Sequence, residues 1–116
     1  MAAEGLARAL SEYFRRRGPL VAGYIELTGQ PDVKVSLRAI APHYEGTKEL
    51  PYLEDALKAL DKERLLKYLE EKVGWRTVCV EGEEYVSIPS RQYVSYVSAS
   101  QDFFKNLLEQ YCSTQR

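Results

Sequence analysis

The chain has 116 residues and a formal net charge of −1 at pH 7, with 45% hydrophobic and 28% charged residues. This length and balance predict one globular domain over residues 1–116, built on one hydrophobic core. No stretch reaches the roughly 20 apolar residues that cross a bilayer, and no signal-peptide pattern follows the N-terminus, so we expect a soluble, cytoplasmic protein with no membrane partner. The near-neutral charge also counts against a duplex-DNA binder, whose surface is usually basic.

The first part of the chain predicts a helix followed by a hairpin. Apolar residues at helical spacing indicate a helix over 2–17, and Gly18-Pro19 ends it. Alternating apolar residues then predict strands over 20–28 and 33–41, separated by a turn. If the aliphatic side of this hairpin packs inward, its other side exposes Tyr24, Lys34, Ser36 and Arg38.

The remainder of the chain predicts a helix, a second hairpin and a last helix. A leucine stripe indicates helix over 50–73, where Asp61 can cap a second segment, and 75–80 with 85–88 form strands joined by a tight turn. After Pro89, residues 91–98 are either a continuation beyond a bulge or a fifth strand, and 101–111 form the last helix. The expected fold is therefore α+β, an antiparallel sheet of about four strands with helices on one face, in the order α-β-β-α-β-β-α.

Sequence motifs of enzymes are missing. The chain has no phosphate-binding glycine loop, no Gly-x-Ser-x-Gly elbow and no His-x-x-x-His pair. Cys79 and Cys112 lack the paired spacing of a zinc site, and the single His43 cannot build a metal cluster. We therefore expect a protein that is not an enzyme, with no catalytic residue, metal or cofactor.

Aromatic residues are the most informative feature, with nine Tyr, one Trp and three Phe, many of them beside cations. Rings stack on unpaired bases and cations contact phosphates, so the sequence predicts binding of single-stranded DNA or unpaired RNA with little sequence preference. The candidate stacking residues are Tyr24, Trp75, Tyr93 and Tyr96. The candidate phosphate contacts are Lys34, Arg38, Arg76 and Arg91, with Arg15, Arg16 and Arg17 as an extended basic rim. The alternative for these rings is ordinary half-buried strand packing.

Two other functions remain open. Residues 61–73 followed by the 75–88 hairpin have the order of a recognition helix and wing, but Glu63, Glu70 and Glu71 would bring carboxylates toward duplex phosphates. A fold of this kind can instead serve protein contacts. The alternative function is therefore a small interaction module, including a homodimer, whose aromatic face is buried against its partner.

The arrangement of a short helix, a basic hairpin, a leucine-rich helix, an aromatic hairpin and a closing helix resembles the ThermoDBP-related single-stranded DNA-binding proteins of thermophilic archaea. The resemblance spans most of the chain and implies binding of single strands in an apolar and aromatic cleft edged by cations. It also implies a homo-oligomer, a dimer formed through a C-terminal coiled coil, but no heptad zipper follows Tyr111 here, so the sequence leaves that dimer open. The low Met and Asn content with many charged residues suits a heat-stable protein.

Overall fold

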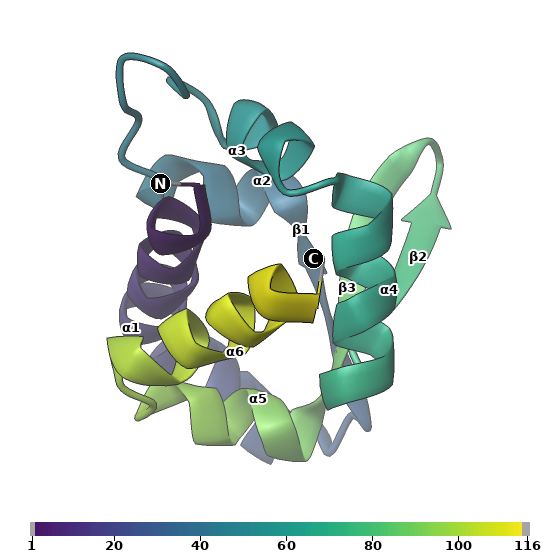
Figure 1. The fold of residues 1–116 in the computed structure, drawn as a ribbon. Coiled ribbons are helices and arrows are strands. Elements are labelled where there is room, and N and C mark those ends of the chain that lie inside the picture. Colours follow the sequence, from purple (N-terminus) through teal and green to yellow (C-terminus); the bar gives the residue numbers. More distant parts are fainter. Residues whose placement is uncertain (1, 115–116) are drawn as a thin grey trace.

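The first helix is longer than the sequence predicts. In the computed structural model, which describes residues 2–114, helix α1 runs from Ala2 to Thr28 (Figure 1). The predicted end at residue 17 and the predicted strand over 20–28 are both wrong. The first hairpin therefore does not form, and Tyr24 lies on a helix.

The interior Gly18-Pro19 pair explains why α1 continues. Proline disfavours helical geometry in the preceding residue partly through a clash with its Cβ, and Gly18 has none. Gly18 is buried, and a Cβ added there would lie 2.7 Å from Val97 Cγ2. The glycine thus permits both the helical path into Pro19 and a close crossing with a later helix.

The middle of the chain turns through short helices. Strand β1 covers only Asp32–Ser36, because the Ser36 hydroxyl accepts the Arg38 N–H and begins helix α2, Leu37–Ile40. A 3-10 helix, η1, follows over Ala41–His43. The predicted long helix is confirmed as two, α3 (Leu53–Ala59) and α4 (Lys62–Val73). Asp61 stands at the bend with φ 61°, although its side chain makes no capping hydrogen bond.

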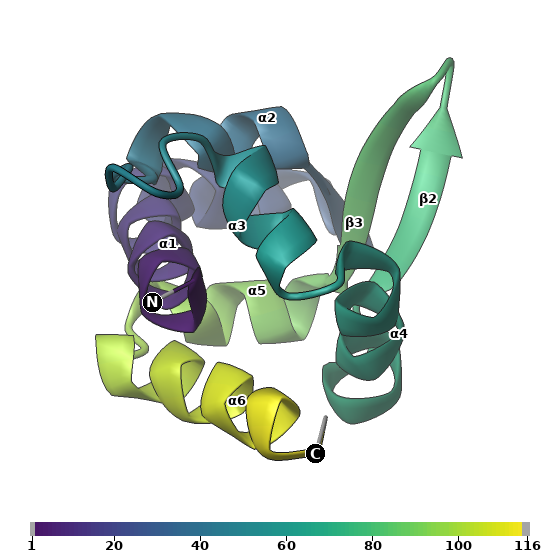
Figure 2. The ribbon, with the colours of Figure 1, turned by 45° about the horizontal axis from the view of Figure 1, so that its top comes forward.

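Three antiparallel strands make up the sheet in residues 2–114, not the four predicted. The predicted second hairpin is confirmed as β2 (Arg76–Val80) and β3 (Glu83–Pro89), joined through Glu81 and Gly82, both at positive φ. Strand β1 pairs with β3, so the order is β1-β3-β2. Figure 2 shows the β2–β3 hairpin rising away from the helices.

Residues 91–98, predicted to be extended, are helical instead. Helix α5 covers Ser90–Val97, and α6 covers Gln101–Thr114, slightly longer than predicted. The Ser90 hydroxyl donates to the Gln30 carbonyl at 2.6 Å and its N–H to the Pro31 carbonyl at 2.9 Å, which fastens the end of β3 to the start of β1. Tyr93 and Tyr96 then lie one helical turn apart and both are buried.

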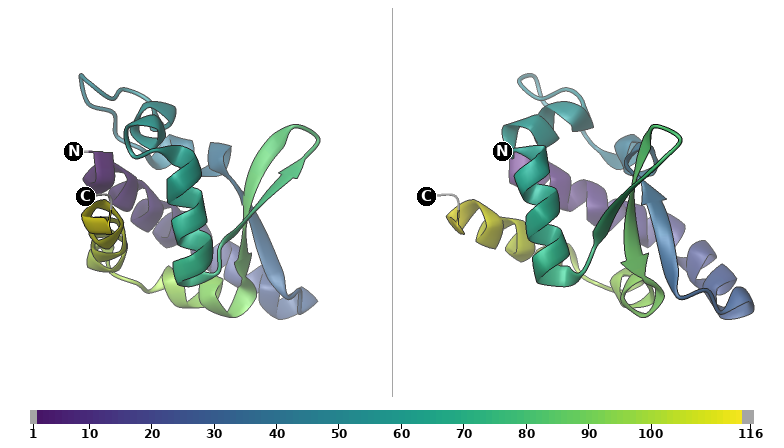
Figure 3. Two further views of the ribbon diagram at one scale, coloured as in Figure 1. Left: turned by 45° about the vertical axis from the view of Figure 1, so that its right-hand side comes forward. Right: turned by 90° about the vertical axis from the view of Figure 1, so that its right-hand side faces the viewer.

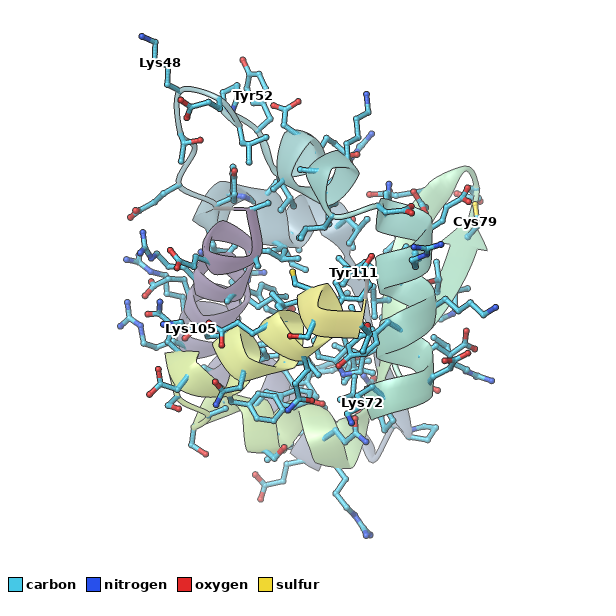
Figure 4. The ribbon with its side chains drawn as sticks, in the orientation of Figure 1. Lys48, Tyr52, Lys72, Cys79, Lys105 and Tyr111 are labelled. Atoms are coloured by element: carbon cyan, nitrogen blue, oxygen red, sulfur yellow. The ribbon has the colours of Figure 1, made fainter. Side chains whose placement is uncertain are left out.

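One hydrophobic core joins these elements. It lies between the helices and the sheet face that carries Val33, Val35, Val86 and Ile88. Helix α1 packs against α3, α5 and α6, and Tyr111 of α6 points into the space beside α4 (Figure 4). Its hydroxyl donates to the Leu60 carbonyl, so α6 is tied to the α3–α4 bend.

The order α1-β1-α3-α4-β2-β3, with β1 beside β3, is the order of a winged helix, to which α2, η1, α5 and α6 are added. In that arrangement α4 takes the place of the recognition helix and β2–β3 that of the wing. None of the described helices is long and apolar enough to cross a membrane.

Candidate nucleic-acid interface

Three of the predicted stacking rings lie in the core. Trp75 is 3% exposed, Tyr93 is fully buried and Tyr96 is 6% exposed. Trp75 Nε1–H donates to the Tyr96 hydroxyl at 3.0 Å, and that hydroxyl donates to Gln92 Oε1 at 3.1 Å. The prediction that these rings form an exposed platform is wrong, because a buried face cannot stack on a base.

These rings belong to an aromatic cluster around Phe14. The Phe14 ring is stacked on Phe104 with centroids 5.5 Å apart, and it contacts Trp75, Tyr93 and Tyr96 at 5.0 to 6.4 Å. The Tyr93 hydroxyl donates to the Tyr13 hydroxyl at 2.9 Å. Burial raises the pKa of the phenols of Tyr13, Tyr93 and Tyr96. The cluster therefore holds neutral, hydrogen-bonded rings whose role is to join α1, α5 and α6.

The sheet brings two of the predicted phosphate contacts together. Lys34 of β1 and Arg76 of β2 both stand opposite Ser87 of the central strand. Directly opposed residues of antiparallel strands point to the same face, so these three side chains form one row across the sheet. Both cations are exposed, and neither makes an ion pair within residues 2–114.

The next row of the same face carries a ring that the sequence prediction missed. Ser36, Tyr85 and Val78 stand opposite one another on β1, β3 and β2, and all three are half-buried. The sequence pattern that could have predicted this position is the alternation of Tyr85 and Ser87 with the aliphatic Val86 and Ile88, which places Tyr85 on the face opposite the core. We call the face formed by Lys34, Ser36, Arg76, Val78, Tyr85 and Ser87 the outer sheet face.

One end of the outer sheet face is closed by a carboxylate. Glu83 accepts a hydrogen bond from the Ser36 hydroxyl at 2.8 Å and one from the Tyr85 hydroxyl at 3.4 Å, and its Oε1 lies 3.7 Å from Arg38 Nε. The Glu83 charge is the main cause that raises the pKa of Tyr85. Arg38 thus lies at this end of the face, on α2 and not on the predicted strand, and its charge is partly neutralised by Glu83.

The remaining predicted residues lie elsewhere. Tyr24 is exposed on α1, and the hairpin that was expected to place it beside Lys34 and Arg38 is absent. Arg91 is exposed on the first turn of α5. The three arginines of the predicted rim are exposed on α1, where two of them, Arg15 and Arg16, are paired with Glu12.

The Glu12 cluster carries a testable pKa. Hydrogen bonds from Arg15 and Arg16 lower the pKa of Glu12 from its ordinary value of 4.5 to about 2. Because the folded-state pKa is depressed, this carboxylate stabilises the fold above pH 4.5, and that contribution is lost as the pH falls toward 2. We expect Arg15→Gln with Arg16→Gln to return the pKa toward 4.5, measured by NMR titration of the Glu12 carboxyl.

Arg17→Gln is the matched control for that titration, since Arg17 makes no hydrogen bond to Glu12 and should leave its pKa low. If Glu12 already has a pKa near 4.5 in the parent protein, then Arg15 and Arg16 do not form lasting hydrogen bonds to Glu12 in solution.

Other ligand chemistries find less support. Within residues 2–114 no three His, Cys, Asp or Glu side chains converge to hold a metal ion. Cys79 lies exposed on the β2–β3 hairpin (Figure 4), three residues after Arg76 on β2. Comparison of the chain with protein-family models, with curated proteins and with solved structures found no match.

Proposed function

We propose that this protein binds single-stranded nucleic acid, DNA or unpaired RNA, on the outer sheet face and with little sequence preference. The observation that carries the proposal is the row of Lys34, Ser87 and Arg76 beside Tyr85 on a face whose cations are open to solvent. The binding face is thus different from the one that Trp75, Tyr93 and Tyr96 would have formed.

The geometry suits a flexible strand. Neighbouring strands lie about 4.8 Å apart, so Lys34 and Arg76 are separated by about 10 Å across the central strand. Two cations at that spacing can contact the backbone on either side of a base that lies on Tyr85. One stacked base contributes about 1 to 3 kcal/mol and every base has a stackable face, which predicts modest affinity and little base preference.

Duplex DNA fits the structure less well. In a winged helix the duplex lies along the recognition helix and the wing, here α4 and β2–β3. The exposed residues of α4 include three carboxylates, Glu63, Glu70 and Glu71, among its cations. The wing turn carries Glu81 and is flanked by Glu83 and Glu84. These charges oppose the phosphate contacts on which duplex binding depends.

The proposal does not depend on the family resemblance. That resemblance relied on two hairpins, and the structure forms only the second. The resemblance and the outer sheet face point to the same class of ligand, but the proposal rests on the residues that lie opposite one another on that face.

The direct test is fluorescence anisotropy of a labelled oligo-dT at low and at physiological salt, with a duplex competitor. We expect binding that weakens with salt and that duplex does not compete. Absence of binding at micromolar protein and low salt would contradict the proposal. Binding that duplex competes as well as oligo-dT would move the site to α4 and the wing.

Variants of the outer sheet face then locate the site. Tyr85→Leu should weaken oligo-dT binding about 5-fold to 150-fold, the equivalent of one stacked base. Lys34→Gln with Arg76→Gln should reduce the slope of log affinity against log salt by about 1.4, since each phosphate contact to a single strand contributes about 0.7. Equal binding by parent and variants would place the site elsewhere.

Matched controls lie on other surfaces. Tyr52, just before α3, is an exposed tyrosine outside the sheet, so Tyr52→Leu should leave binding unchanged. Lys67 of α4 and Lys105 of α6 are exposed cations away from the outer sheet face, and their double glutamine variant should preserve the salt slope.

A further inference from the structure

Helix α1 carries an apolar stripe that the rest of the described chain does not cover. Leu20 is 71% exposed, Tyr24 58% and Leu27 87%. Residues separated by four and then three positions lie on the same side of a helix. Three large apolar side chains gathered in this way mark an interaction surface, whereas scattered exposed leucines would not.

The stripe continues the core-facing side of the same helix. Leu6, Tyr13, Leu20 and Leu27 follow one another at intervals of seven, the spacing of one seam along a helix. The first two are buried against the body of the protein and the last two are exposed. The right-hand view of Figure 3 shows the last turns of α1 extending past α5, and Leu27 on these turns is 87% exposed.

Gly23 is a second sign of a partner on this surface. It lies within α1 beside Tyr24, and a Cβ added there would meet no atom within 4 Å. Glycine weakens a helix interior, and nothing else in the described chain needs the space that it leaves. A missing side chain at this position lets another helix approach closely.

The charges select an antiparallel partner. Arg16 and Arg17 precede the stripe, and Glu26 lies near its other end, where α1 has no basic residue in its last turn. The C-terminal end of a helix attracts cations. In an antiparallel pair of these helices, Arg16 and Arg17 of each copy would lie beside the C-terminal end of α1 in the other copy. It would also leave the two protein bodies at opposite ends, whereas a parallel neighbour would force them side by side.

We propose that two copies of this chain associate through the Leu20, Tyr24 and Leu27 stripe of α1, packed antiparallel about Gly23 and Tyr24. A stable interface buries about 800 Å² on each partner, and three side chains provide less than that. Self-association should therefore be reversible and in the micromolar range. This inference is independent of the nucleic-acid-binding proposal.

Sedimentation velocity over a range of micromolar concentrations tests the dimer. We expect a concentration-dependent dimer in the parent, and Leu20→Gln with Leu27→Gln should weaken it at least about a hundredfold. Both leucines are exposed, so the circular dichroism spectrum should be unchanged, and the thermal midpoint should not fall at a concentration where the parent is monomeric. A parent that stays monomeric, or a double variant that dimerises as well as the parent, would overturn the proposal.

Disulfide trapping tests the orientation in a background with Cys79 and Cys112 changed to Ser. Seven residues of helix span about 10 Å, whereas disulfide-bonded Cα atoms lie about 4 to 7 Å apart. Leu20→Cys mixed with Leu27→Cys should therefore form a cross-linked dimer, while each variant alone should not. Cross-linking of each variant on its own would show a parallel pair and overturn the antiparallel arrangement.

The two proposals fail separately. The Leu20→Gln, Leu27→Gln protein should bind a single oligo-dT strand through its outer sheet face as the parent does. The Tyr85→Leu protein should dimerise as the parent does. Loss of oligo-dT binding in the Leu20→Gln, Leu27→Gln protein would mean that the oligonucleotide binds at the α1 stripe and not at the outer sheet face.

Discussion

Trp75→Ala is expected to lower the free energy of unfolding by about 3 to 5 kcal/mol, the usual cost of removing a large buried ring. Trp75 lies in the chain just before β2 and is buried, its ring contacts Phe14 and Tyr96, and its indole N–H donates to the Tyr96 hydroxyl. Alanine would leave a cavity in the aromatic cluster. Urea denaturation followed by far-ultraviolet circular dichroism measures the change.

Trp75→Phe is the matched control. It keeps an aromatic ring in the site and removes the indole donor, while the Tyr96 hydroxyl keeps its bond to Gln92. We expect the smaller loss of about 1 kcal/mol that a missing hydrogen bond brings. If Trp75→Ala instead unfolded like the parent and lost oligo-dT binding, Trp75 would be a ligand contact, as its sequence setting first indicates.

The second large effect is expected at the crossing of α1 and α5. A side chain at Gly18 has its Cβ 2.7 Å from Val97 Cγ2 and 3.4 Å from two further atoms of the same valine. Gly18→Val should therefore cost about 1 to 3 kcal/mol through overpacking. Thermal and urea unfolding measure the loss.

Two further proteins show whether the contact is responsible. Gly23→Val places the same side chain five residues along the same helix, where a Cβ meets nothing within 4 Å, and it should change monomer stability little. Val97→Ala combined with Gly18→Val should recover part of the loss, with a coupling of about 1 kcal/mol between neighbouring sites. Equal losses at Gly18 and Gly23 would show that the contact with Val97 is not the cause, since valine has a higher helix propensity than glycine and propensity alone would not produce a loss.

Elements whose signals lie close together in the chain were predicted correctly. The β2–β3 hairpin needs only two short strands and a turn at Glu81-Gly82, and both turn residues adopt positive φ. The α3–α4 pair follows a leucine stripe interrupted at Asp61. Helix α6 begins after Ser100 and presents Phe104, Leu107 and Leu108 to the core. Each of these depends on contacts within a few residues.

Errors arose where an apolar pattern fits two periods. Residues 20–28 can be read as alternating or as helical, and so can 91–98. Whether these segments form strand or helix depends on contacts with distant parts of the chain. Gly18 packs closely against Val97, and the Tyr93 hydroxyl donates a hydrogen bond to Tyr13, 80 residues away in the chain. Strand β1 likewise pairs with β3, about 50 residues on, because the chain leaves the expected hairpin as a helix.

Composition and residue order by themselves determined an α+β chain with a β2–β3 hairpin, a leucine-rich helix pair and cations at Lys34 and Arg76. Only the tertiary structure decided which faces these elements show. A strand presents residues to two faces and a helix to all sides, so exposure depends on what packs against them. That packing buried Trp75, Tyr93 and Tyr96, placed Lys34 and Arg76 on either side of Ser87, and left the α1 stripe uncovered.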